Sequence, residues 1–294
     1  MNQTSMPTVI LGDDMPPELA ADVSNALQQM GVIVRANGTS ARPRGSKLIV
    51  VISPKGGSGK TAIASNLAVA LAERHPGRVV VVDLDVQFGD LESALALSAE
   101  RTLAPLVNGS QVDATTLKLF LTPYASSLYV LAGAHDPVAA ESITPAHVAA
   151  VLPMLAEEFE YVIVDTPAGL DDRTLAAVEC ANELLLVSSL DVSSIRNLRK
   201  ATDALDKIGI TTPRQFVLNR ADAKVGLTAA DAEEAVGMPI LCSIPSSRDL
   251  PLSMNVGTPV VLGNRRSPVA RHLLQLAEHY APAATAKARR SWRR

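Results

Sequence analysis

Three features are scarce in this sequence: aromatic residues, cysteines and long apolar runs. Aromatic side chains make up 3% of the 294 residues, which disfavours a base-stacking platform for single-stranded nucleic acid. Cys180 and Cys242 are the only cysteines and lack the spacing of metal ligands, so we expect buried, reduced thiols. No run approaches the roughly 20 apolar residues of a spanning helix, and the first residues lack the pattern of a signal peptide. We therefore expect a cytoplasmic protein.

Charge and apolar content narrow the class of protein further. The formal net charge is -3 and the pI is about 6.0, which argues against a surface that binds nucleic acid everywhere and leaves room for a local basic patch. Residues of the apolar set make up 47% of the chain, enough to bury the core of one large α/β domain.

The stretch KLIVVISPKGGSGKTAIASNLAVALA, residues 47–72, is the most informative part of the sequence. The apolar run 48–52 predicts a buried strand, and a glycine-rich loop leads from it into a helix that begins near Lys60. Glycines let successive backbone N–H groups turn inward, and the helix adds the positive end of its dipole, so the loop is suited to bind phosphate groups. The residues expected to contact nucleotide here are Gly56, Gly57, Ser58, Gly59, Lys60, Thr61 and Ala62.

Two residue types in this loop indicate a triphosphate with its metal ion. Lys60 is expected to reach the β and γ phosphates, and the Thr61 hydroxyl is expected to bind Mg²⁺. Pro54 stands where the usual G-x-x-x-x-G-K-[ST] pattern has its first glycine, and Lys55 follows it. The loop is therefore a variant with a second lysine.

Two later valine-rich runs end in carboxylates. Residues 78–85 read RVVVVDLD, ending in Asp83 and Asp85, and residues 161–165 read YVIVD, ending in Asp165. Continuous apolar runs are typical of parallel strands buried on both faces, whose carboxyl ends carry the functional groups of open α/β sheets. Asp165 is thus the natural second anchor for Mg²⁺.

The whole chain alternates predicted strands and helices. This order predicts a doubly wound, mostly parallel sheet flanked by helices, with parallel β-α-β units throughout. Residues 103–121 are expected to be mostly helical. We expect a short β-α-β-like extension and linker at 1–45, the main domain at 46–281, and a basic flexible tail at 282–294.

Three motifs, SPKGGSGKT, VVVDLDVQFGD and YVIVDTPAGLDD, stand in this order with strand contexts. Together they resemble the MinD/ParA superfamily of phosphate-loop ATPases with a deviant Walker A loop. Within it, DLDVQFGD, DTPAGLDD, VLNR and IPSSRDLPLSMNVGTPV most resemble the CpaE/TadZ proteins of tight-adherence (Flp-type) pilus assembly. Those proteins commonly carry a full receiver-like domain ahead of the ATPase, whereas about forty-five residues precede it here.

The resemblance implies a role for each matching residue. Lys55 matches the signature lysine that reaches the nucleotide of the other subunit, which implies an ATP-dependent homodimer. Asp85 matches the aspartate that orients or polarises the attacking water, so Asp85, Lys55 and Lys60 are the expected catalytic residues. Asp165 matches the aspartate that holds Mg²⁺ through water, with Asp83 as a nearby carboxylate in the second shell.

The adenine base of the nucleotide is expected to contact residues that lie later in the sequence. By the same resemblance, Asn219 matches the position that recognises adenine, Arg220 lies beside it, and Pro245 with the following loop forms the other wall. The implied cofactors are ATP and Mg²⁺, and the implied activity is slow hydrolysis, with loops 85–91 and 165–172 ordering around the γ-phosphate.

The partner is left open by the sequence. Protein partners in a membrane-associated assembly machine are the first expectation, with a peripheral contact at the inner face of the cell membrane as an addition. MinD-type septum positioning, ParA-type DNA partitioning and a non-hydrolysing ATP-dependent scaffold remain alternatives. The tail 287–294 has too little apolar face for firm membrane insertion, and the basic residues of helix 193–207 are diluted by aspartates, so DNA is the weaker candidate.

Overall fold

The fold is described from a computed structural model, whose compact units are Met1–Arg42 and Pro43–Arg294. In the first unit, β1 (Thr8–Leu11) pairs in parallel with β2 (Ile33–Ala36). The helix predicted within this unit and the predicted C-terminal tail lie outside the described residues. None of the helices described is long and apolar enough to cross a membrane. The described residues are 8–11, 33–36, 45–107, 112–125 and 127–281.

An eight-stranded sheet forms the centre of the second unit as far as the structure describes it, with the strand order β10-β9-β8-β3-β7-β4-β6-β5. All neighbours are parallel except β5, which runs antiparallel to β6. The predicted mostly parallel, doubly wound sheet is therefore confirmed. Its strands are β3 (Lys47–Ser53), β4 (Val79–Asp83), β5 (Thr122–Tyr124), β6 (Leu128–Leu131), β7 (Tyr161–Ala168), β8 (Glu183–Ser189), β9 (Arg214–Asn219) and β10 (Ile240–Ile244).

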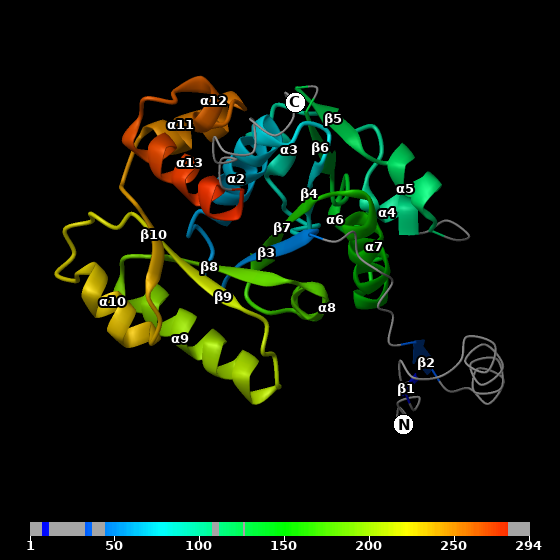
Figure 1. Cartoon of the computed structure of the whole chain (residues 1–294), viewed down its shortest axis with the longest axis horizontal. Helices are drawn as coiled ribbons and strands as arrows, with labels where there is room; N and C mark the ends of the chain where they lie inside the picture. The colour runs from blue at the N-terminus through cyan, green and yellow to red at the C-terminus, as the bar shows by residue number, and fades with distance from the viewer. Residues whose placement is uncertain (1–7, 12–32, 37–44, 108–111, 126, 282–294) are drawn as a thin grey trace, which may run out of the picture. The chain divides into compact units, whose positions relative to one another are not determined.

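Helices cover both faces of the sheet, as Figure 1 shows. Alternate residues of β3 pack on opposite faces: Ile49 and Val51 meet the layer of α2 and α13, whereas Val50 meets the layer of α7, α8 and α9. The strands therefore need apolar side chains at every position. The helices are α2 (Lys60–Arg74), α3 (Leu91–Ala94), α4 (Leu103–Val107), α5 (Ala114–Leu119), α6 (Pro137–Ala140), α7 (Pro145–Glu158), α8 (Asp172–Cys180), α9 (Val192–Lys207), α10 (Ala229–Val236), α11 (Asp249–Val256), α12 (Val260–Gly263) and α13 (Pro268–Tyr280).

Residues 103–121 were expected to be mostly helical. The structure has two short helices there, α4 and α5, followed by the edge strand β5. Asp113 begins the second helix because its side chain accepts a hydrogen bond from the Thr116 backbone N–H at 2.7 Å. Pro123 lies in β5 and is tolerated because an edge strand has neighbours on one side only. The expectation of parallel units throughout is therefore wrong at this edge.

The helix α13 packs its apolar stripe against α2, so a cavity there is expected to be costly. Leu273 lies on this stripe and is 0% exposed. We expect Leu273→Ala to lower the free energy of unfolding by about 2–5 kcal/mol, because the neighbouring elements close such a cavity only in part. Urea denaturation measures the change. Leu119→Ala is the control, since Leu119 is 61% exposed and its loss is expected to stay within about 0.5 kcal/mol. Equal losses in the two variants would contradict this packing.

Candidate nucleotide-binding site

The phosphate loop joins β3 to α2 at the carboxyl end of the central strand. Gly57 and Gly59 have positive φ values of +72° and +98°, a conformation that L side chains adopt only with strain. A Cβ on Gly59 would also overlap the side-chain nitrogen of Asn219. Gly59 is the residue before the first turn of α2, where no side-chain cap occupies the helix N-terminus. The backbone N–H groups of that turn therefore lie open to an anion.

Lys60 begins α2 as a buried cation, although lysines are rarely buried. Burial lowers the pKa of its ammonium group, and the nearby carboxylates of Asp165 and Asp85 oppose that shift. Ser58, also buried, has a hydroxyl oxygen without a hydrogen-bond partner. A buried hydroxyl without a partner and a buried charge both cost free energy, and a phosphate group would meet both.

Asp165 is brought to the loop by strand pairing. It lies on β7, opposite Val51 of β3, and it is 0% exposed. Burial raises the pKa of its carboxyl to about 7, against the opposing effects of the Thr61 hydroxyl and the Lys60 ammonium. Neither carboxylate oxygen makes a hydrogen bond of good geometry. A buried carboxylate with free oxygens beside a hydroxyl has the oxygen ligands that Mg²⁺ prefers, so Asp165 and Thr61 fit that ion.

The described residues contain no ready-made group of three metal-binding side chains. This agrees with the way Mg²⁺ is usually held at phosphate loops, by one or two carboxylate or hydroxyl oxygens together with the phosphates and water.

Asp83 and Asp85 lie beside Asp165, because β4 pairs with the other edge of β7 and places Asp83 opposite Asp165. Asp85 is partly buried, and burial raises the pKa of its carboxyl while Lys60 opposes the rise. The two oxygens of Asp83 accept hydrogen bonds from the backbone N–H groups of Asp85, at 3.0 Å, and Leu91, at 3.4 Å. Asp83 is therefore engaged with the following loop.

Lys55 lies on the other side of the phosphate loop and is turned toward α9. Its ammonium group donates to Asp191 Oδ1 at 3.1 Å and to Ser193 Oγ at 2.9 Å. Asp191 is also the N-cap of α9, where it accepts from the Ser194 backbone N–H at 2.9 Å. Burial would raise the pKa of Asp191, but hydrogen bonds from the Ser194 hydroxyl and backbone N–H, the Ser193 hydroxyl and Lys55 outweigh it and hold the pKa well below its usual range. An aspartate just before a predicted helix is an N-cap signal, so the sequence itself indicates this role for Asp191.

The residues predicted to bind the base line one cavity of about 300 Å³. The Asn219 side chain donates to the Ser58 carbonyl at 2.8 Å and accepts from the Arg220 backbone N–H at 2.9 Å. Asn219 thus ties the end of β9 to the phosphate loop. The cavity is lined by Gly59, Ala62, Asn219, Arg220, Pro245, Ser246, Ser247, Leu250, Pro251 and Met254.

Several contributors to this cavity were missed from the sequence. Leu250, Pro251 and Met254 come from α11, a helix that was not predicted, since its apolar residues have no clear helical period. Asp222 fixes the facing loop by accepting a hydrogen bond from the Ser246 backbone N–H at 2.6 Å. Asp222 lies three residues after the end of β9, so its place in the loop at this strand end was the signal that could have found it.

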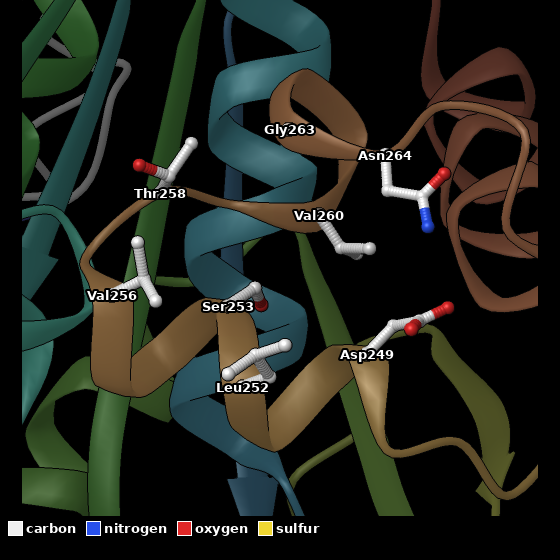
Figure 2. A pocket seen from close by; sticks show the side chains of 8 residues that line it. All are labelled: Asp249, Leu252, Ser253, Val256, Thr258, Val260, Gly263 and Asn264. Atoms are coloured by element: carbon white, nitrogen blue, oxygen red, sulfur yellow. The ribbon is translucent and has the colours of Figure 1, made fainter.

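The other side of α11 lines a second cavity, shown in Figure 2, of about 270 Å³. Leu252 and Val256 lie on its rim and are 60% and 62% exposed. None of the residues predicted to bind nucleotide lines it. The cavity beside Asn219, which shares Gly59 and Ala62 with the phosphate loop and its helix, is therefore the better place for a base.

A strand that runs into a glycine-rich loop, a helix that opens with a buried lysine, and carboxylates on adjacent parallel strands together define a phosphate-loop nucleotide-binding protein. Residues 49–260 match the family model described as the CobQ/CobB/MinD/ParA nucleotide binding domain. The chain belongs to this family.

Individual relatives agree with that assignment. The septum site-determining protein MinD of Thermotoga maritima is 31% identical over 240 residues, which cover 78% of this chain and 86% of the relative. A crystal structure of a ParA family ATPase from Chlorobium tepidum is 25% identical with a TM-score of 0.74, covering 80% and 99% of the two chains. The septum site-determining protein MinD of Pyrococcus horikoshii, solved with Mg-ADP, is 27% identical with a TM-score of 0.73, covering 82% and 98%.

The raised pKa of Asp165 predicts that the nucleotide-free protein loses stability as pH rises. The folded state keeps the proton up to about pH 7, whereas the unfolded chain releases it near pH 3.8, so stability falls through that interval. Asp165→Asn removes this loss. At about 1.36 kcal/mol per pH unit, the wild type loses roughly 2.7 kcal/mol between pH 5 and the folded-state pKa of about 7. We therefore expect the variant to gain about 5–10 °C in Tm over the wild type between pH 5 and pH 8.

Thermal melts in EDTA without nucleotide measure this difference. Asp90→Asn is the matched control, because Asp90 is an exposed carboxylate of the neighbouring loop, and its melting temperature should follow the wild type at both pH values. A constant gap between Asp165→Asn and the wild type across this range would show that Asp165 does not titrate there.

Proposed function

We propose that this chain binds Mg-ATP and hydrolyses it slowly, as a switch that dimerises in the ATP-bound state. The observation that carries the proposal is the buried carboxylate of Asp165, which lies next to Lys60 and Thr61 while neither of its oxygens makes a hydrogen bond of good geometry. These neighbours balance its charge only in part, and the metal ion of a bound nucleotide would complete the balance.

Each part of the phosphate site has its own task in this proposal. The N–H groups at the start of α2 and the Lys60 ammonium bind the β and γ phosphates and neutralise their charge. Thr61 and Asp165 hold Mg²⁺, which when bound draws charge from the phosphate oxygens. The protein therefore contributes to catalysis mainly by positioning the reacting groups and by stabilising the charge on the phosphates.

Asp85 is the residue proposed to orient the attacking water. It is a partly buried carboxylate, and the influence of Lys60 on its pKa shows that the two charges are close. The water adds to the γ-phosphorus as the bond to the bridging oxygen breaks, and ADP leaves with that oxygen. The products are ADP and phosphate.

Lys55 is the residue proposed to act across a dimer interface. Within the same chain its ammonium group is held by Asp191 and Ser193 at the start of α9. Its side chain is 42% exposed, so the ion pair with Asp191 is solvent-screened and of the kind that contributes little stability. Lys55 can therefore leave this contact for the phosphates of a second subunit at small cost.

For the biological setting we propose a CpaE/TadZ-type localisation or assembly factor for Flp pili, acting with protein partners at the inner face of the cell membrane. The support is the sequence of the DLDVQFGD, DTPAGLDD and VLNR segments. The relatives named septum site-determining protein and ParA family ATPase keep septum positioning and partitioning open as alternatives. A scaffold that binds ATP without turning it over is the non-enzymatic alternative.

Lys60→Ala tests the nucleotide site. The loss of a buried ammonium from the phosphates is expected to weaken Mg-ATP binding by about 100-fold, since a hydrogen bond to a charged group contributes up to about 3 kcal/mol. Isothermal titration calorimetry with Mg-ATP measures it. Lys224→Ala, which removes an exposed lysine, is the control and should bind as the wild type does. Wild-type affinity in Lys60→Ala would overturn the site.

Asp85→Ala and Lys55→Ala separate hydrolysis from dimerisation. Asp85→Ala should lower phosphate release by about 100-fold, the usual contribution of a group that positions or activates water, and leave a stable ATP-bound dimer. Lys55→Ala in the Asp85→Ala background should return that dimer to monomers. Phosphate release assays and light scattering after gel filtration report the two properties. Phosphate release by Asp85→Ala at the wild-type rate would contradict the role of Asp85 in hydrolysis. A monomeric Asp85→Ala at saturating ATP would contradict the ATP-bound dimer.

A further inference from the structure

The loop that carries Asp85 is fixed at its ends and exposed in its middle. We call residues 84–90, between β4 and α3, the Asp85 loop. Leu84 donates its backbone N–H to the Asp165 carbonyl at 2.8 Å, and Leu84, Val86 and Leu91 are buried. Phe88 between them is 75% exposed. Burial of apolar side chains therefore anchors the two ends of the loop but cannot by itself set the direction of the Asp85 side chain.

The carboxylate of Asp83 connects the two ends of this loop. One oxygen accepts from the Asp85 backbone N–H at 3.0 Å, and the other accepts from the Leu91 backbone N–H at 3.4 Å. Asp83 is 3% exposed, so water hardly competes for these bonds. The side chain thus closes the loop into a ring and holds the backbone of Asp85 at its start.

Gly89 fits against the same carboxylate. A Cβ at this position would lie within 2.6 Å of Asp83 Cγ and Oδ1, far closer than atoms can approach. The φ of Gly89 is not in the positive range, so its backbone conformation is open to other residues. A glycine is required here only because the loop backbone packs against the Asp83 side chain and leaves no space for a Cβ atom.

A second glycine supports the other side of the loop. A Cβ at Gly133, which follows β6, would lie 3.0 Å from the Asp83 carbonyl oxygen and 3.0 Å from Val86 Cα. The loop is therefore packed closely from a neighbouring segment as well as held from within.

We propose that Asp83 is a positioning residue for hydrolysis, with Gly89 as its matching partner: the Asp83 carboxylate sets the Asp85 loop in the conformation that places the Asp85 side chain. This goes beyond the proposed function, on which it rests, because it replaces a role for Asp83 near the metal ion with a role in the loop. Loss of the Asp83 carboxylate, or a side chain added at Gly89, should misplace Asp85. Nucleotide binding by the phosphate loop should stay intact in both cases.

A double-mutant cycle tests this pairing. Asp83→Ala and Gly89→Ala should each lower kcat for ATP by about 10- to 100-fold and change KM by less than about 2-fold, since only the positioning of the water is lost. The double variant should be no worse than Asp83→Ala alone, because the added methyl group then meets no carboxylate. Glu234→Ala, which removes an exposed carboxylate from α10 and lies outside the Asp85 loop, is the control and should keep wild-type kcat.

Amide hydrogen exchange in the nucleotide-free protein gives a readout independent of activity. The N–H groups of Asp85 and Leu91 should exchange at least about 10-fold faster in both single variants than in the wild type, because their acceptor is lost or displaced. Additive losses of kcat, or unchanged exchange at these two amides, would overturn the positioning role. A wild type that hydrolyses no ATP would instead overturn the proposed function, and the exchange rates would still decide whether Asp83 holds the loop. Circular dichroism confirms that each variant is folded.

Discussion

A buried carboxylate beside a buried ammonium is the constraint on which the site depends. Asp165 and Lys60 can lie together only because β7 pairs with β3, the strand that leads into the phosphate loop. The same strand pairs with β4 on its other edge and brings Asp83 to the same level. Carboxylates gathered in this way are costly to keep charged without a metal ion. A metal ion that enters with a phosphate removes this cost, which favours binding.

The groups around this centre are held in place by contacts with neighbouring elements. Lys55 is held by the N-terminus of α9, and the Asp85 loop is held by Asp83 at the end of β4. Asn219 joins the base cavity to the phosphate loop through the Ser58 carbonyl. Each contact involves a loop at the end of a different strand. The parallel sheet therefore fixes several short loops at the carboxyl ends of its strands.

Some parts of the sheet and the site could be predicted from the sequence, and others could not. Continuous valine-rich runs are typical of buried parallel strands, and the glycine-rich composition of the loop at 53–61 is typical of a phosphate loop. The strands at the centre of the sheet were predicted on that basis. Helix α11 and strand β5 were missed because their few apolar residues follow no clear period. The two partners of Lys55 were also missed, since they are distant in sequence and ordinary in composition.

The order of the central elements, the phosphate loop and the carboxylates at the strand ends can be read from the sequence, because each depends on residues that are neighbours along the chain. Folding in three dimensions sets which strands lie side by side, and thus that Asp165 lies between Val51 and Asp83. It also determines that Asp83 bonds the Asp85 loop and that Lys55 bonds Asp191. Such pairings depend on distances of a few ångströms between side chains, and the packing of the sheet and its helices sets these.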